Sequence, residues 1–248
     1  MTPGVWTVLL VFFRFSGMLV TLPLFKNSAL PRTFRVGLAV VLTPLIAPLT
    51  PTVQAVPGSA PGLLVGVLWE LMIGGAMGWV FLFVVSACGG AGAMMDLQCG
   101  LANSTILNPG ADTGSQTLLS TLMETLALLC LLQSDAHLIA VEALARSLRW
   151  SPVGMVGEGY AALGGMIYSL MMGYFGALLS ILFPVLFGML CVEVALAFLS
   201  RLMPSLNMLT TAAPLRVLIG LFLVTVSLPL ITSEIDALMI KTLGLLGA

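Results

Sequence analysis

Four acidic residues stand inside apolar stretches of the chain, where ionisable groups are rare: Glu70, Asp96, Glu124 and Glu193. A charge that faces lipid at the centre of a bilayer costs at least about 2.5 kcal/mol on insertion scales, so each carboxylate must face protein or water. Such groups can carry protons or ions across a membrane. They can also bond neighbouring helices and helix ends, and this second interpretation is the one that the sequence favours.

The chain carries no recognisable catalytic set. His137 is its only histidine, so the His-Glu-x-x-His motif of zinc proteases cannot form. No nucleophile elbow and no phosphate-binding glycine loop are present. The cysteines lie in apolar runs without close pairing and are interpreted as helix-packing residues: Cys88, Cys99, Cys130 and Cys191. We therefore expect no enzyme activity, no cofactor and no bound metal.

The composition is that of a protein that lives in lipid. Only 8% of the 248 residues are charged and 59% are hydrophobic, whereas soluble domains carry about 25% charged residues. Stretches without Asp, Glu, Lys, Arg or His, such as 71–95 and 159–192, exceed the roughly 20 residues of a spanning helix. We expect one membrane-embedded domain over 1–248, surrounded by membrane lipid. The net charge of −1, without a basic block, argues against a nucleic-acid partner.

Prolines, glycines and charges divide the chain into apolar segments that predict helices at 4–25, 34–49, 61–87, 117–133, 160–200 and 214–232. The first is interpreted as a retained helix, because it lacks the basic start and the cleavage site of a signal peptide. Pro44 predicts a kink or a short half-helix in the second segment. Because Pro184 interrupts the fifth segment, it is either a helical hairpin or one long bent helix.

A short amphipathic helix is predicted after the fourth segment, with Ser134 or Asp135 as its N-cap. Glu142 and Arg146 form an i,i+4 pair on its polar face. Apolar residues recur at helical spacing on the opposite face: Leu138, Val141, Leu144, Ala145 and Leu148. This face is expected to lie in lipid headgroups or against another subunit.

Two features suggest close packing and a specialised loop. Gly74 and Gly78 form a G-x-x-x-G step, which lets helices approach closely in lipid. Further along, Asn108-Pro109-Gly110 must break any helix. Non-helical backbone at membrane depth survives only where protein buries it or water bathes it. The stretch is thus either a pore-facing, re-entrant element or an ordinary exposed loop.

The chain resembles the FliR family of flagellar export-gate proteins, whose injectisome counterparts serve virulence-type secretion. The shared features run nearly from end to end: Arg14, Pro23, Pro31-x-x-x-Arg35, Glu70, Gly74, Gly78, Gly92-x-x-x-Asp96-x-Gln98-x-Gly100, Asn108-Pro109, Ser147, Pro152, Arg201-x-x-Pro204-x-x-Asn207 and Pro214. The chain departs from the family at two points. Ser205 stands where the family usually has glutamine, and Ser134-Asp135-Ala136-His137 stands where it tends to have Gly-Gly-His. The overall pattern favours the flagellar system.

The resemblance implies an all-α, multi-helix membrane protein with hairpin-like and kinked helices, present as a single copy in a helical, dome-like export gate. FliP-like and FliQ-like subunits would complete the hetero-oligomer, and an FlhB-like subunit would attach at the base. Unfolded export substrates would pass through the centre. The implied location is the bacterial inner membrane at the flagellar basal body, with much of the assembly raised toward the periplasm.

The resemblance also implies site residues. The loop after the Asp-x-Gln-x-Gly motif would plug the pore, which places the plug at about 105–116, beginning with Thr105, Ile106, Leu107, Asn108, Pro109 and Gly110. The motif and subunit-packing residues would be Gly74, Gly78, Asp96, Gln98, Gly100, Arg201, Pro204, Asn207 and Pro214. The alternative function is an ion-coupled secondary transporter that uses the four acids of the apolar segments. Transporters usually show inverted repeats and paired broken helices, whereas this sequence shows one convincing break and no repeat.

Overall fold

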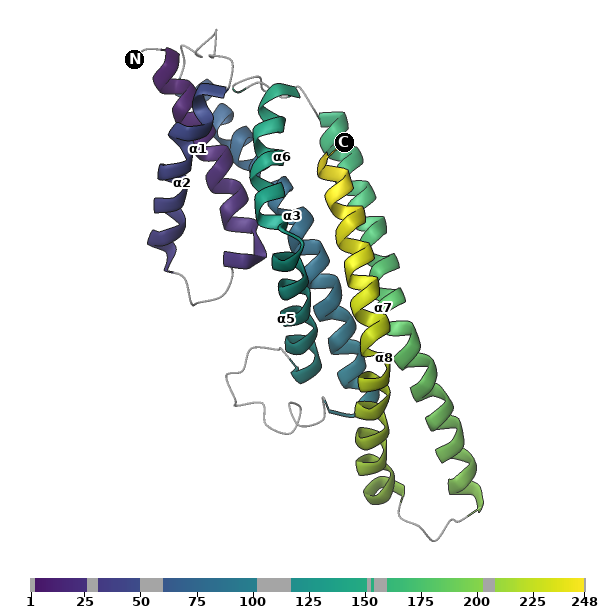
Figure 1. The fold of residues 1–248 in the computed structure, drawn as a ribbon. Helices are drawn as coiled ribbons and strands as arrows, with labels where there is room; N and C mark the ends of the chain where they lie inside the picture. Colours follow the sequence, from purple (N-terminus) through teal and green to yellow (C-terminus); the bar gives the residue numbers. More distant parts are fainter. Residues whose placement is uncertain are drawn as a thin grey trace. The chain divides into compact units, whose positions relative to one another are not determined.

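A computed structural model describes residues 3–25, 31–49, 60–101, 117–150, 153, 160–202 and 208–247. Within these residues all elements are helical, as the sequence predicts for an all-α membrane protein (Figure 1). Three of the described helices are long and apolar enough to cross a bilayer: Pro61–Cys99, Ile167–Leu202 and Pro214–Thr242. A fourth span is possible if the two helices between 118 and 148 form one broken span.

The chain divides into two compact units. The first contains residues 1–83, 131–172 and 240–248. It begins with α1 (Pro3–Thr21) and α2 (Arg32–Ile46), which pack against each other, and each is followed by a short 3-10 turn, Pro23–Phe25 and Ala47–Leu49. It also holds the first part of α3 (Ala60–Cys99) and all of α6 (Ala136–Trp150).

The second unit contains residues 84–130 and 173–239. It consists of the last part of α3, most of α5 (Leu118–Gln133), and the larger parts of α7 (Tyr160–Leu202) and α8 (Met208–Gly247). Pro184 lies inside α7, and Pro214 and Pro229 lie inside α8. The long helices α3, α7 and α8 run through both units. The single domain expected from the sequence stays a prediction.

Two helices differ from their predicted bounds, and a third decides between two alternatives. Helix α3 continues to Cys99 instead of ending near 87, because its glycines at 89, 90 and 92 pack against other helices rather than forming a turn. The hairpin alternative for 160–200 is wrong, since α7 is one helix that continues through Pro184. Helix α8 extends beyond 214–232 at both ends.

The amphipathic helix α6 begins directly after Asp135, and Glu142 pairs with Arg146 at 2.7 Å as predicted. Its predicted apolar face is partly wrong. Leu144 and Leu148 are buried, but Leu138 is 60% exposed. Small residues on the buried side, including Ala140 and Ala143, allow the helix to pack within the first unit.

Asp135 is the only described residue other than glycine with a positive φ, at 51°. Left-handed backbone costs an L-residue roughly 1 kcal/mol, although aspartate tolerates it better than most. We therefore expect Asp135→Gly to raise the free energy of unfolding by up to about 1 kcal/mol. Denaturant titration in detergent would measure this, with Ser134→Gly as the control. A loss of stability in Asp135→Gly would contradict the prediction.

Helices α1 and α3 cross at almost backbone-to-backbone distance. A Cβ atom added to Gly17 would lie 2.5 Å from the carbonyl oxygen of Leu71, and one added to Gly78 would lie 2.7 Å from that of Met18. One added to Gly74 would overlap the Arg14 carbonyl group. This crossing brings side chains of α1 and α3 into direct contact, including the charged pair described next.

Candidate functional site: two buried polar junctions

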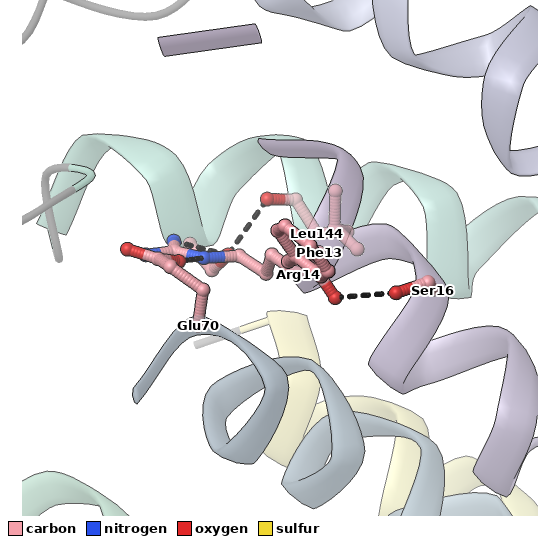
Figure 2. Close-up of polar contacts among 6 residues, drawn as sticks. Phe13, Arg14, Ser16, Glu70 and Leu144 are labelled. Carbon is pink, nitrogen blue, oxygen red and sulfur yellow. Dashed lines mark hydrogen bonds and ion pairs between the residues drawn. The ribbon is translucent and has the colours of Figure 1, made fainter. Parts of the chain in front are cut away.

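The first junction joins three helices of the first unit through Arg14, which lies in the middle of α1. Its Nε donates a hydrogen bond to Glu70 Oε2 on α3 at 2.5 Å, and both side chains are fully buried (Figure 2). Its Nη1 donates to Ser147 Oγ on α6 at 3.2 Å, and Ser147 in turn donates to the Leu144 carbonyl oxygen. One guanidinium group therefore fixes the mutual positions of α1, α3 and α6.

Burial explains why this junction takes the form of an ion pair. A lone charge at this depth would have to be neutralised or paired. Arginine stays protonated in proteins, so the Glu70 carboxylate compensates its charge, and the guanidinium has enough donors to bond two helices at once. The pair confers little net stability but makes any arrangement that separates the partners costly. It thus favours one packing of the three helices.

The second junction lies at the end of α3, in the second unit. Gly100 has a φ of 78° and its N–H donates to the Leu97 carbonyl oxygen, while the Leu101 N–H donates to the Asp96 carbonyl oxygen. These two bonds form a Schellman motif, in which a left-handed glycine ends a helix. The spacing of Asp96 and Gly100 is therefore that of a helix C-terminus.

The side chain of Asp96 bonds a different helix. Its Oδ2 accepts hydrogen bonds from the backbone N–H groups of Leu119 at 2.9 Å and Ser120 at 3.2 Å, in the first turn of α5. Asp96 is completely buried. A negative carboxylate at a helix N-terminus satisfies free N–H groups and interacts favourably with the helix dipole. Asp96 thus acts as an N-cap supplied by another helix.

Small residues allow this contact. A Cβ atom added to Gly92, one turn before Asp96, would lie 2.5 Å from the Leu119 carbonyl oxygen and 2.7 Å from Ser120 Cα. One added to Gly220 of α8 would lie 2.8 Å from Cys99 Cβ. Helices α5 and α8 therefore both lie tightly against the last turns of α3.

The other two acids of the apolar segments lie in different surroundings. Glu193 pairs with Arg216 at 3.3 Å between α7 and α8, and their side chains are 46% and 38% exposed. Glu124 is half-buried on α5 and covers Gly89 of α3, where an added Cβ would lie 2.5 Å from its Oε1. Among the described residues, no group of three or more His, Cys, Asp or Glu side chains could hold a metal ion.

The structure places the remaining predicted site residues as follows. Gly74 and Gly78 lie at the α1–α3 crossing, Gln98 is half-buried in the last turn of α3, and Arg201 is exposed near the end of α7. Pro214 is exposed inside α8. The whole predicted plug, 105–116, lies outside the described residues, and so do Pro204 and Asn207.

Sequence reasoning missed two sets of partners. It identified Glu70 and Asp96 as buried acids, but it did not pair Glu70 with Arg14 or find the bonds from Asp96 to α5. The sequence did hold a signal for the Arg14–Glu70 pair, because these two residues are lone opposite charges in separate apolar segments. No sequence signal marks the second, since an N-cap supplied by a distant helix depends on the packing of α3 against α5.

The fold and the two junctions define an all-helical integral membrane protein whose buried charges hold helices together. A family model described as "Bacterial export proteins, family 1" matches residues 5–242. Three similar relatives are each named flagellar biosynthetic protein FliR. That of Caulobacter vibrioides is 28% identical over 90% of this chain and 89% of its own. That of Escherichia coli is 27% identical over 94% of this chain and 88% of its own. That of Bacillus subtilis is 25% identical over 90% of this chain and 86% of its own.

The chain belongs to this family of bacterial export proteins, the FliR family. Membership confirms the resemblance seen in the sequence, and the three apolar helices agree with a membrane location. It also disfavours the alternative of an ion-coupled transporter. The structure adds a physical argument, because the Glu70 and Asp96 carboxylates are engaged in buried bonds that hold helices.

Proposed function

We propose that this inner-membrane component of the flagellar export apparatus forms part of the channel for unfolded export substrates. The match of the export family to residues 5–242 carries the proposal. FliP-like and FliQ-like subunits are the proposed companions, with an FlhB-like subunit at the base. Unfolded chains need a conduit and no covalent chemistry, which fits a protein whose buried polar groups serve packing.

Exposed apolar surface supports the proposed hetero-oligomer. Several large side chains of α7 and α8 are exposed, including Phe183 at 65%, Phe198 at 65% and Phe222 at 64%. Lipid alone could cover such a surface, but the partly exposed Glu193–Arg216 pair lies between the same helices. Because hydrocarbon solvates an ion pair poorly, companion subunits are the better cover for this region.

Two short apolar helices support the proposal that part of the assembly is raised toward the periplasm. Helices α1 and α2 have 19 and 15 residues, whereas a spanning helix needs roughly 20. Neither is among the helices that are long and apolar enough to cross a bilayer, because their apolar parts are limited to Val5–Thr21 and Thr33–Ile46. Such helices suit a protein-enclosed position above the bilayer.

The segment 105–116 is the proposed pore plug. Its sequence places the apolar pair Ile106 and Leu107 before the helix breaker Asn108-Pro109-Gly110. Broken backbone at membrane depth needs protein or water around it, and an apolar constriction can stop ions by expelling water. We propose that Ile106 and Leu107 seal the closed channel and that glycines at 110 and 114 let the segment move aside.

Deletion of 106–114 tests the plug. We expect the gate assembled from this variant and its companion subunits to conduct ions and small solutes in the resting state, because the seal is missing. Conductance across planar bilayers would measure this. Ile106→Asn/Leu107→Asn should leak as well, whereas Val41→Asn, at a side chain 68% exposed on α2, should not. Unchanged permeability of both loop variants would refute the plug.

The native mass of the detergent-extracted protein tests the hetero-oligomer. Expressed together with its companion subunits, the chain should appear in one discrete, many-subunit particle. A stable monomer in the presence of those subunits would contradict the proposal. Substrate-dependent proton flux in liposomes that contain this chain alone would instead support the transporter alternative.

A further inference from the structure

One face of α7 in the second unit carries a regular row of exposed side chains, called here the α7 face. Its members recur at intervals of three or four residues: Phe183, Phe187, Leu190, Val194, Phe198 and Arg201. All but Arg201 are apolar, and the rings of Phe183 and Phe187 stack with centroids 6.2 Å apart. This spacing is the heptad pattern with which one helix lies along another at a small crossing angle.

The opposite side of α7 is covered by the chain itself. Ile181, Val185 and Met189 are fully buried there. A Cβ atom added to Gly188 would lie 2.8 Å from the Cδ1 atom of Leu223 on α8. A soluble or membrane helix that is apolar all round is normally buried on every side. The α7 face is therefore a second packing surface, which no described part of the chain covers.

The ion pair Glu193–Arg216 argues against lipid as the cover of the α7 face. Arg201 lies eight residues beyond Glu193, which corresponds to about 12 Å along a helix. With Arg201 at the headgroups, the partly exposed pair would lie that much deeper, in hydrocarbon, where charges are costly. With the pair at the headgroups, Phe198 would stand in water. A protein surface can cover the apolar residues and the charges together.

Arg201 adds a requirement of charge. Its side chain is exposed, and it forms no ion pair within the described part of the chain. A helix that covers the α7 face would bury the guanidinium group, and a buried charge needs a partner. Guanidinium groups bind carboxylates through two parallel hydrogen bonds. The covering helix must therefore present a carboxylate opposite Arg201.

We infer that the α7 face binds one helix of a companion subunit, which carries apolar residues at heptad spacing and an aspartate or glutamate that pairs with Arg201. This inference rests on the proposed hetero-oligomer and defines the kind of helix that the chain meets in it. The apolar side chains supply the buried area. The ion pair sets the register, because the carboxylate meets Arg201 at a single position along the two helices.

A photo-crosslinking residue shows what covers the α7 face. We expect p-benzoylphenylalanine, placed at Phe187 or Phe198 in the gate assembled with its companion subunits, to attach to a companion subunit on illumination. The mass of the crosslinked chain should then rise by that of a whole protein. Attachment only to lipid, attachment only to a second copy of this chain, or no attachment at either position would overturn the inference.

Variants of Arg201 test the ion pair. Arg201→Met should lower the assembled fraction about tenfold or more, because the companion's carboxylate would stay buried without a partner. Arg201→Lys keeps the positive charge and should recover most of the assembly. Arg146→Met, at an exposed arginine of α6, is the matched control and should assemble as the parent does. Native mass measures the assembled fraction, and far-UV circular dichroism of each extracted chain checks that its helices form.

The outcomes separate this inference from the proposed hetero-oligomer. A parent that forms the many-subunit particle, together with an Arg201→Met variant that assembles equally well, would overturn the inference and leave the hetero-oligomer standing. A parent that stays monomeric beside its companion subunits would overturn both. Crosslinks to a companion subunit, loss of assembly in Arg201→Met and recovery in Arg201→Lys would support both.

Discussion

Replacement of Arg14 by methionine is expected to lower the free energy of unfolding by about 3–5 kcal/mol, the usual cost of breaking a buried ion pair by removing one partner. The Glu70 carboxylate would keep its fully buried position but lose the guanidinium that compensates its charge. The bond from Arg14 to Ser147 would disappear as well, so α6 would lose its polar link to α1. Denaturant titration in detergent, followed by far-UV circular dichroism, would measure the change.

The double variant Arg14→Met/Glu70→Met provides the decisive control. Because it removes both charges and keeps apolar volume, it should recover most of the lost stability. The exposed pair Glu142–Arg146 offers a matched surface comparison on α6, where Arg146→Met should cost less than about 1 kcal/mol. A double variant as unstable as Arg14→Met would show that the loss comes from packing and not from an uncompensated charge.

Substitution of Gly74 by valine is the second change expected to have a large effect. Even a single Cβ atom at this position would overlap the Arg14 carbonyl group, which belongs to backbone and cannot swing away. The α1–α3 crossing would have to widen, at a cost of about 1–3 kcal/mol or more. Widening would also pull Arg14 away from Glu70, so the loss should exceed that of a simple overpacked core.

Gly37 of α2 provides the matched control, because a Cβ atom added there meets no other described atom within 4 Å. Gly37→Ala should leave stability unchanged or raise it by about 0.5–1 kcal/mol, the usual gain when alanine replaces glycine inside a helix. The stability of Gly74→Ala should lie between that of this control and that of Gly74→Val. Equal stability of Gly74→Val and Gly37→Ala would contradict the close crossing.

The sequence predicted the helical class, the membrane location and most helix positions, because long apolar stretches are strong signals. It failed where tertiary contacts override local signals. The predicted segment ends near residue 87, yet α3 continues to Cys99, and Gly89, Gly90 and Gly92 in this added part lie against α5 and α7. Pro184 left a hairpin and one long bent helix open as alternatives, and the structure shows that α7 continues through it as one helix.

The candidate site could likewise be predicted only in part. Burial of Glu70 and Asp96 followed directly from lone acids in apolar segments. Their partners did not follow, since the partner of Glu70 is 56 positions away and the partners of Asp96 are 23 and 24 positions away. Sequence separation of this size carries no periodic signal, and only the crossing of the helices defines these contacts.

Pro229 has a consequence for the mechanics of α8. A proline inside a helix cannot donate to the carbonyl four residues earlier, here that of Thr225. Around it, the hydroxyls of Thr225, Thr232 and Ser233 bond to carbonyl oxygens of the preceding turn, a pattern that tends to bend helices. Resistance to flexing should therefore be reduced between 225 and 233, so force applied to the two ends of this helix would increase its curvature there.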